Sequence, residues 1–65
     1  RDGKVFRQLV DAVGSRCRLV LSNGDEIEGV LRSFRWSPLI LCIHGSSRVL
    51  VNFRHVLKMV LEEVR

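Results

Sequence analysis

The chain has 65 residues, 46% of them hydrophobic, and carries eleven Lys and Arg against seven Asp and Glu. This length predicts one domain, over residues 1–65, which buries only roughly 60% of its unfolded surface. No apolar run approaches the roughly 20 residues of a membrane span and no signal peptide is visible, so we expect a cytoplasmic protein with no membrane partner.

The first half of the chain predicts a helix at about residues 4–13 and then a hairpin of two strands, at about 16–22 and 26–35. Asn23-Gly24 joins these strands and is a strong hairpin signal. Gly29 falls within the second strand, where it permits a bulge or a sharp bend. The helix shows apolar residues at helical spacing, followed by Gly14 as a C-terminal cap: Val5, Phe6, Leu9, Val10 and Val13.

Three further strands are predicted at about 39–44, 48–52 and 56–60. Pro38 precedes the first of them, whose run LILCI is apolar at every position and therefore predicts a strand covered on both faces. The fold class is mainly β: an N-terminal helix and a small, strongly bent five-stranded antiparallel barrel. Its edge strands are apolar, and we expect them to pair with neighbouring subunits in a ring.

Cys17 and Cys42 lie far apart in apolar runs. Each is predicted to be a buried free thiol rather than part of a disulfide or a metal site. A small chain with excess apolar surface and no such crosslink is expected to oligomerise. Nine of the eleven cations are arginine, which favours phosphate and bases as partners, although a solvated basic surface has the same composition.

Phe53, Arg54 and His55 interrupt the apolar sequence between the last two strands. A simple turn at this point more commonly uses Asn, Gly, Asp or Pro. An aromatic ring beside a guanidinium supplies a stacking surface for a base and a partner for phosphate. The alternative is a packed corner, with Phe53 in the core and two solvated polar side chains. The residues alone leave both interpretations open.

In the order of its elements the chain resembles the Sm-like superfamily, and within it the Hfq family of bacterial RNA chaperones. The resemblance extends from Phe6 to Val60. The segment LSNGDEIEGVLRSF is similar to the first family motif, with its hairpin turn, bending glycine and Ser-Phe strand end. The triplet of residues 53–55 is similar to the second Hfq motif, where eukaryotic and archaeal Sm proteins usually carry Arg-Gly in place of Arg54-His55.

The resemblance implies a homo-oligomeric ring, with six subunits as the leading expectation and five or seven as alternatives. It also implies an RNA site at the pore, on the face that bears the helix. There Phe53 stacks on a uracil, Arg54 contacts phosphate or a base carbonyl, and His55 points into the pore. The expected partner is therefore short single-stranded RNA, with U-rich sequences preferred over A-rich ones.

The chain departs from the family pattern at several positions. Arg35 and Trp36 stand where Hfq proteins usually have Asp and Gln, and they complete the set of candidate RNA-binding residues. Trp36 either supplies a second aromatic to the pocket or fills a subunit contact. The arginine cluster used for binding at the rim is missing from the helix. On the distal face, Val20, Asp25 and Glu26 replace purine-binding features, so we expect weak poly-A binding.

The sequence does not predict an enzyme or a cofactor. Ser46 and Ser47 lie near His44 without an acid to complete a nucleophilic triad, and neither a phosphate-binding glycine loop nor zinc-ligand spacing is present. Two functions remain. One is a ring that holds U-rich RNA and acts as an RNA chaperone in post-transcriptional regulation. The other is an Sm-like structural or protein-interaction platform whose RNA sites have decayed.

Overall fold

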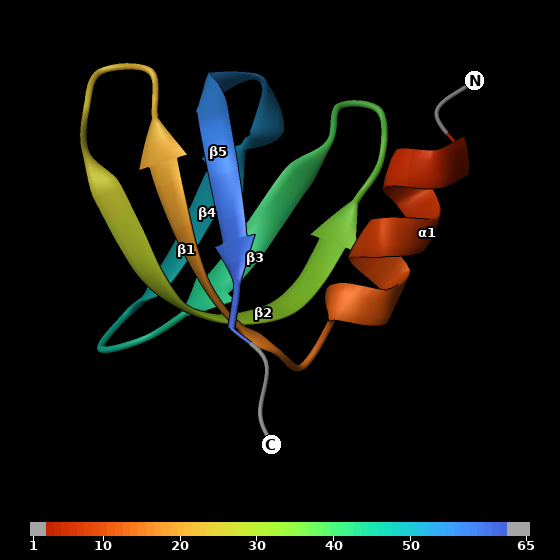
Figure 1. Cartoon of the computed structure of the whole chain (residues 1–65), viewed down its shortest axis with the longest axis horizontal. Coiled ribbons are helices and arrows are strands. Elements are labelled where there is room, and N and C mark those ends of the chain that lie inside the picture. Colours follow the sequence, from red (N-terminus) through yellow and green to blue (C-terminus); the bar gives the residue numbers. More distant parts are fainter. Residues whose placement is uncertain (1–2, 63–65) are drawn as a thin grey trace.

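The computed structural model describes residues 3–62 and contains one α-helix, five strands and one short 3-10 helix (Figure 1). Each predicted element is present, with both ends within one residue of the prediction. The predicted domain also includes residues 1, 2 and 63–65, which lie outside the described residues. The elements are α1 (Gly3–Ala12), β1 (Arg16–Leu21), β2 (Glu26–Arg35), β3 (Ile40–His44), β4 (Arg48–Asn52), η1 (Phe53–His55) and β5 (Val56–Leu61).

The strands form one antiparallel sheet in the order β4-β3-β2-β1-β5, which confirms the mainly β class. The sheet is strongly bent, and α1 lies beside it (Figure 1). Because β4 and β5 are its two edges and do not pair with each other, the sheet of a single chain stays open rather than closing into a barrel. No helix among the described residues is long and apolar enough to cross a membrane.

Two predicted turns have the expected backbone. Gly14 and Gly24 both have a φ of +94°, a conformation that glycine adopts without steric cost. At the hairpin, the backbone N–H of Asp25 donates to the side-chain oxygen of Asn23 over 3.0 Å. The N–H of Gly14 donates to the carbonyl of Leu31 over 2.7 Å, so the end of α1 is fixed against β2.

Gly29 is required by a close approach of β2 and β3. A Cβ atom at this position would lie 2.8 Å from the carbonyl oxygen of His44, and one at Gly45 would lie 2.8 Å from the carbonyl oxygen of Glu28. The irregularity in the β2–β3 ladder lies further on, between Leu31 and Ser33. The predicted bend of β2 is therefore present. Gly29 allows β2 and β3 to approach each other closely, and the irregularity in the ladder lies at other residues.

The core lies on the concave face of the sheet under α1. Leu9 and Ala12 of the helix pack there, and Val51 contributes from β4. Alternate residues of the central strands are fully buried, as expected for strands that are covered on one face. These fully buried residues are Cys17, Leu19, Leu31, Leu41 and Ile43.

Apolar residues of the helix and of the third strand are partly uncovered in the single chain, and the prediction of a third strand covered on both faces was wrong. Phe6, Val10 and Val13 belong to the predicted apolar face of the helix, yet each is more than two-fifths exposed. The third strand is covered on one face only, because Ile40 and Cys42 point away from the core and are half-buried. The physical reason is that α1 is the one helix packed on the sheet in the described part of the chain, so it covers one face.

The cysteines differ in burial, although both are free thiols. Cys17 is fully buried as predicted, whereas Cys42 is only half-buried. Burial raises the pKa of the Cys17 thiol above its ordinary value of 9.0, and the nearby Glu62 carboxylate acts in the same direction. Stability from the neutral thiol is therefore fully present below pH 9.0 and declines as the pH rises through the raised pKa.

We expect Cys17 to resist alkylation until the protein unfolds. In a Cys42→Ser variant, iodoacetamide at neutral pH should add no mass to the native protein and one carbamidomethyl group in denaturant, since the thiolate is the reactive species. Intact-mass spectrometry checks this. Rapid labelling of the native variant would show that β1 is not covered as described.

Candidate nucleic-acid interface

The triplet of residues 53–55 forms η1, a single 3-10 turn between β4 and β5. Asn52 caps its start, since its side-chain oxygen accepts a hydrogen bond from the backbone N–H of Arg54 over 3.1 Å. At its end, the N–H of Val56 donates to the carbonyl of Phe53. These bonds satisfy local backbone groups and hold the backbone of the turn.

Two longer-range hydrogen bonds hold η1 between neighbouring loops. The N–H of Phe53 donates to the carbonyl of Leu39 over 2.9 Å, which connects η1 to the β2–β3 loop. The N–H of Ser22 donates to the carbonyl of His55 over 2.8 Å, which connects it to the β1–β2 hairpin. The turn therefore has a fixed position at the end of the sheet.

The three side chains have different surroundings. Arg54 and His55 are exposed, so a guanidinium and an imidazole are available to a ligand. Phe53 is half-buried and packs against the core. Phe53 therefore contributes to packing, as the corner interpretation of the triplet expects, and it also lines the groove beside α1.

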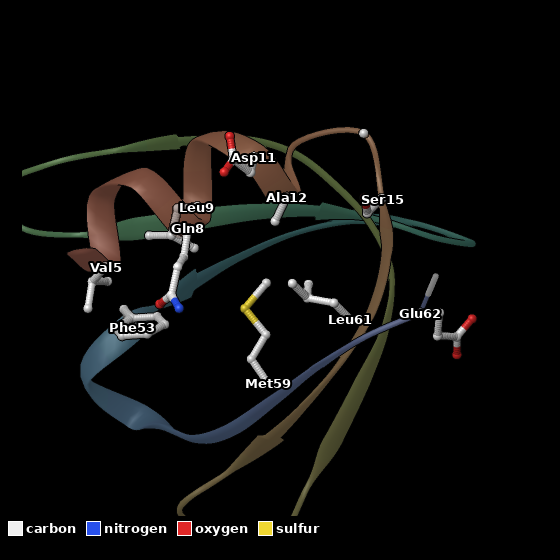
Figure 2. A pocket seen from close by; sticks show the side chains of 11 residues that line it. Val5, Gln8, Leu9, Asp11, Ala12, Ser15, Phe53, Met59, Leu61 and Glu62 are labelled. Carbon is white, nitrogen blue, oxygen red and sulfur yellow. The ribbon is translucent and has the colours of Figure 1, made fainter. Parts of the chain in front are cut away.

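A groove of about 840 Å³ separates α1 from β5, and Phe53 lies at one end of it (Figure 2). Its floor is apolar, and among the described residues Asp11 and Glu62 supply carboxylates. No Lys or Arg of residues 3–62 lines the groove, although Nε of Arg16 lies 3.7 Å from Oε1 of Glu62. The lining residues are Val5, Gln8, Leu9, Asp11, Ala12, Gly14, Ser15, Phe53, Met59, Leu61 and Glu62.

Trp36 lies in the β2–β3 loop and contacts α1. Its ring is 5.5 Å from that of Phe6 with an interplanar angle of 71°, and Phe6 also contacts Phe34 at 5.7 Å and 83°. Edge-to-face contacts of this kind are favourable between aromatic rings. Trp36 remains 43% exposed, which leaves part of its ring available for RNA or for another subunit.

The candidate residues do not all converge on one point. Arg35 is exposed at the end of β2, opposite Ile40, whose other partner is Asn52. Arg35 is therefore connected through the sheet to the residue that caps η1. Trp36 and Phe53 are connected through the β2–β3 loop, by the hydrogen bond to Leu39, while the Trp36 ring itself packs against Phe6.

Sequence reasoning missed Asn52 and Phe6. Asn before a short turn is a recognised N-terminal cap, so the sequence contained a usable signal for Asn52. Phe6 was recognised only as part of the apolar face of the helix, because its helical spacing is the same whether it packs inward or against a loop. Its contact with Trp36 depends on the path of the β2–β3 loop, for which local sequence gives no signal.

No family model matches the chain, and no curated protein is similar enough in sequence to establish a relationship. The resemblance to the Hfq family therefore rests on the motifs and on the order of the elements.

Proposed function

We propose that this protein is a cytoplasmic, ring-forming RNA-binding protein that holds short single-stranded U-rich RNA at η1. The observation that carries the RNA assignment is the hydrogen-bonded turn in which Arg54 and His55 are exposed and Phe53 is half-buried. A guanidinium and an aromatic ring on neighbouring residues suit a phosphate and a base of one strand. A role as an RNA chaperone in post-transcriptional regulation follows by resemblance to the Hfq family.

Assembly into a ring is supported by the two free edges of the sheet. Leu50 on β4 is 69% exposed, and Leu57 and Leu61 on β5 are 71% and 44% exposed. Unpaired apolar edge strands are prone to pair with another chain. Pairing β4 of one copy with β5 of the next satisfies both edges and repeats head to tail, and such a contact closes into a ring when the rotation per copy permits it. Six subunits is the leading proposal.

The preference for U-rich RNA is supported by the residues of the β1–β2 hairpin, to which the resemblance to the Hfq family assigns purine binding. Asp25 and Glu26 are exposed at the turn, and Val20 lies directly opposite Glu26 in the β1–β2 ladder. This region lacks a stacking aromatic and carries carboxylates, which repel the phosphates of an A-rich strand.

We expect the protein to assemble and to bind oligo-U about tenfold more tightly than oligo-A of equal length, a difference of about 1.4 kcal/mol. Native mass spectrometry gives the subunit number with and without each oligonucleotide, and fluorescence anisotropy at one fixed salt concentration gives the affinities. A soluble monomer at micromolar concentration contradicts the ring. Equal or reversed affinities contradict the assignment of RNA to η1.

A second candidate is a protein-interaction platform with the same ring. It is favoured by the exposed apolar side of α1, where Phe6, Val10 and Val13 lie at i, i+4 and i+7 and the Phe6 ring contacts that of Trp36. A ring that forms normally but shows no measurable affinity for either oligonucleotide supports this second function.

A further inference from the structure

The hydrogen bonds that hold η1 differ in how far a single side chain controls them. Three of the four bonds given for this turn join two backbone groups, so they form with most side chains in place. The fourth runs from the backbone N–H of Arg54 to the side-chain oxygen of Asn52 over 3.1 Å. Of these four bonds, the one to Asn52 is therefore the bond that truncation of a side chain removes.

The direction of the Arg54 side chain depends on this bond. The N–H groups at the start of a short helix have no acceptor inside it, so without Oδ1 of Asn52 the N–H of Arg54 is left to water. The Arg54 side chain is exposed, and none of the side-chain hydrogen bonds and ion pairs within residues 3–62 includes its guanidinium. Its direction is therefore set by its own backbone, which Asn52 holds.

The type of residue at position 52 agrees with such a role. Asn is depleted from strands, yet Asn52 is the last residue of β4 and pairs with Ile40 of β3. Pairing alone would favour a β-branched residue at this position. Asn is among the most favoured residues at the start of a helix, so the cap is the structural gain that offsets its low strand propensity.

We propose that Asn52 is a positioning residue for RNA binding at η1. Its Oδ1 atom holds the backbone of Arg54, and this keeps the guanidinium in the direction from which it contacts a phosphate. A turn whose backbone is ordered before binding loses less conformational entropy when the complex forms, so its affinity is higher. This inference rests on the proposed function, because Asn52 acts on RNA through Arg54.

Asn52→Thr and Asn52→Val form a matched pair for the test. Both introduce a β-branched residue of nearly the same shape, so both should suit the end of β4 equally well. The threonine hydroxyl can accept a hydrogen bond from the N–H two residues later, whereas valine has no acceptor. Both variants remove the amide of Asn52, so any contact made by Nδ2 is lost in both.

For Asn52→Val we expect the Kd for oligo-U to rise about fivefold, because the uncapped turn should hold the binding direction for about a fifth of the time. Asn52→Thr should stay within about twofold of the parent. Fluorescence anisotropy at one fixed salt concentration gives the affinities. It is measured well below the melting temperature of every variant, since a cap that served folding alone would lower that temperature without changing the affinity of the folded protein.

Hydrogen exchange followed by NMR checks the bond itself in the absence of RNA. The backbone amide of Arg54 should exchange faster in Asn52→Val than in Asn52→Thr, because only the threonine can protect it. Equal exchange of this amide in the two variants overturns the assignment of the cap.

A double-mutant cycle shows whether Asn52 acts through Arg54. Once Arg54→Ala has removed the guanidinium, its direction no longer matters, so adding Asn52→Val should weaken binding by less than about twofold further. Independent contributions would instead multiply their separate effects on Kd.

The outcomes separate this inference from the proposed function. If Arg54→Ala binds oligo-U as the parent does, the site at η1 is wrong and the positioning role falls with it. If Arg54→Ala weakens binding but Asn52→Val does not, the site stands and the positioning role is wrong. Equal losses in Asn52→Thr and Asn52→Val, or losses that multiply in the double variant, also overturn it, because they indicate a contact by the amide or an effect independent of Arg54.

Discussion

A Gly29→Ala variant is expected to lose about 3 kcal/mol of folding stability. The new methyl group would lie 2.8 Å from the carbonyl oxygen of His44 and 2.9 Å from Cγ2 of Ile43, a fully buried side chain. Neither neighbour can move freely, because the carbonyl belongs to β3 and the isoleucine is packed in the core. A domain of this size has a total stability of about 3–10 kcal/mol, so the variant should be close to unfolded.

Urea unfolding followed by circular dichroism measures this effect. With a denaturant dependence of about 1 kcal/mol per molar urea, the midpoint should fall by about 3 M, or the protein should be unfolded without urea. Gly3→Ala is the matched control, because no atom lies within 4 Å of a Cβ atom at Gly3 and alanine favours the helix. Equal midpoints for Gly29→Ala and the parent would show that β2 and β3 do not approach as closely as described.

The elements of the fold could be predicted from sequence because their signals are local. The Asn23-Gly24 turn, the cap at Gly14 and the alternation in the first two strands all depend on residues close in the chain. The sequence also indicated that a glycine at position 29 matters for the second strand, but it did not indicate the structural reason. A glycine that permits a bulge and a glycine that permits strand contact look the same until the partner, His44, is known.

Burial could be predicted less well, because hydrophobicity does not show which partner covers a residue. Phe6, Val10 and Ile40 have the spacing or composition of core residues, yet each is exposed or half-buried in the single chain. An apolar residue at a subunit contact and one in the core both gain from removal from water. The excess of apolar residues that indicated oligomerisation is the same excess that the single chain leaves partly exposed.

The residues of the candidate site could be chosen from the sequence, but their burial and their hydrogen-bond partners could not. Phe53, Arg54 and His55 are prominent in the sequence because polar side chains interrupt an apolar run. Their placement depends on hydrogen bonds to Leu39 and Ser22, which are 14 and 33 residues away from their partners. Long-range pairs of this kind leave no local pattern, so the sequence could not show that Phe53 is half-buried while its neighbours are exposed.

Arg54→Ala is expected to weaken oligo-U binding and to flatten its salt dependence while the ring stays intact. Each phosphate contact with a single strand contributes about 0.7 to the slope of log affinity against log salt, through release of counterions. Arg54 is exposed in the single chain, so a ring that binds RNA with all its copies loses several such contacts at once. Binding measured by fluorescence anisotropy at several salt concentrations gives the slope, and Arg32→Ala, another exposed arginine, should retain the parent slope.

A substitution of Phe53 distinguishes the contribution of base stacking to RNA affinity from the contribution of phosphate contacts. Phe53→Leu keeps an apolar side chain against the core but removes the flat ring, so it should weaken binding by about 1–3 kcal/mol per stacked base with little change in the salt slope. Thermal unfolding of both variants is the control, because Phe53 also packs against the core and a fall in melting temperature would indicate lost structure rather than a lost contact. If Arg54→Ala binds oligo-U as the parent does at both low and high salt, the triplet is a structural corner, and the protein-interaction platform becomes the better account of the ring.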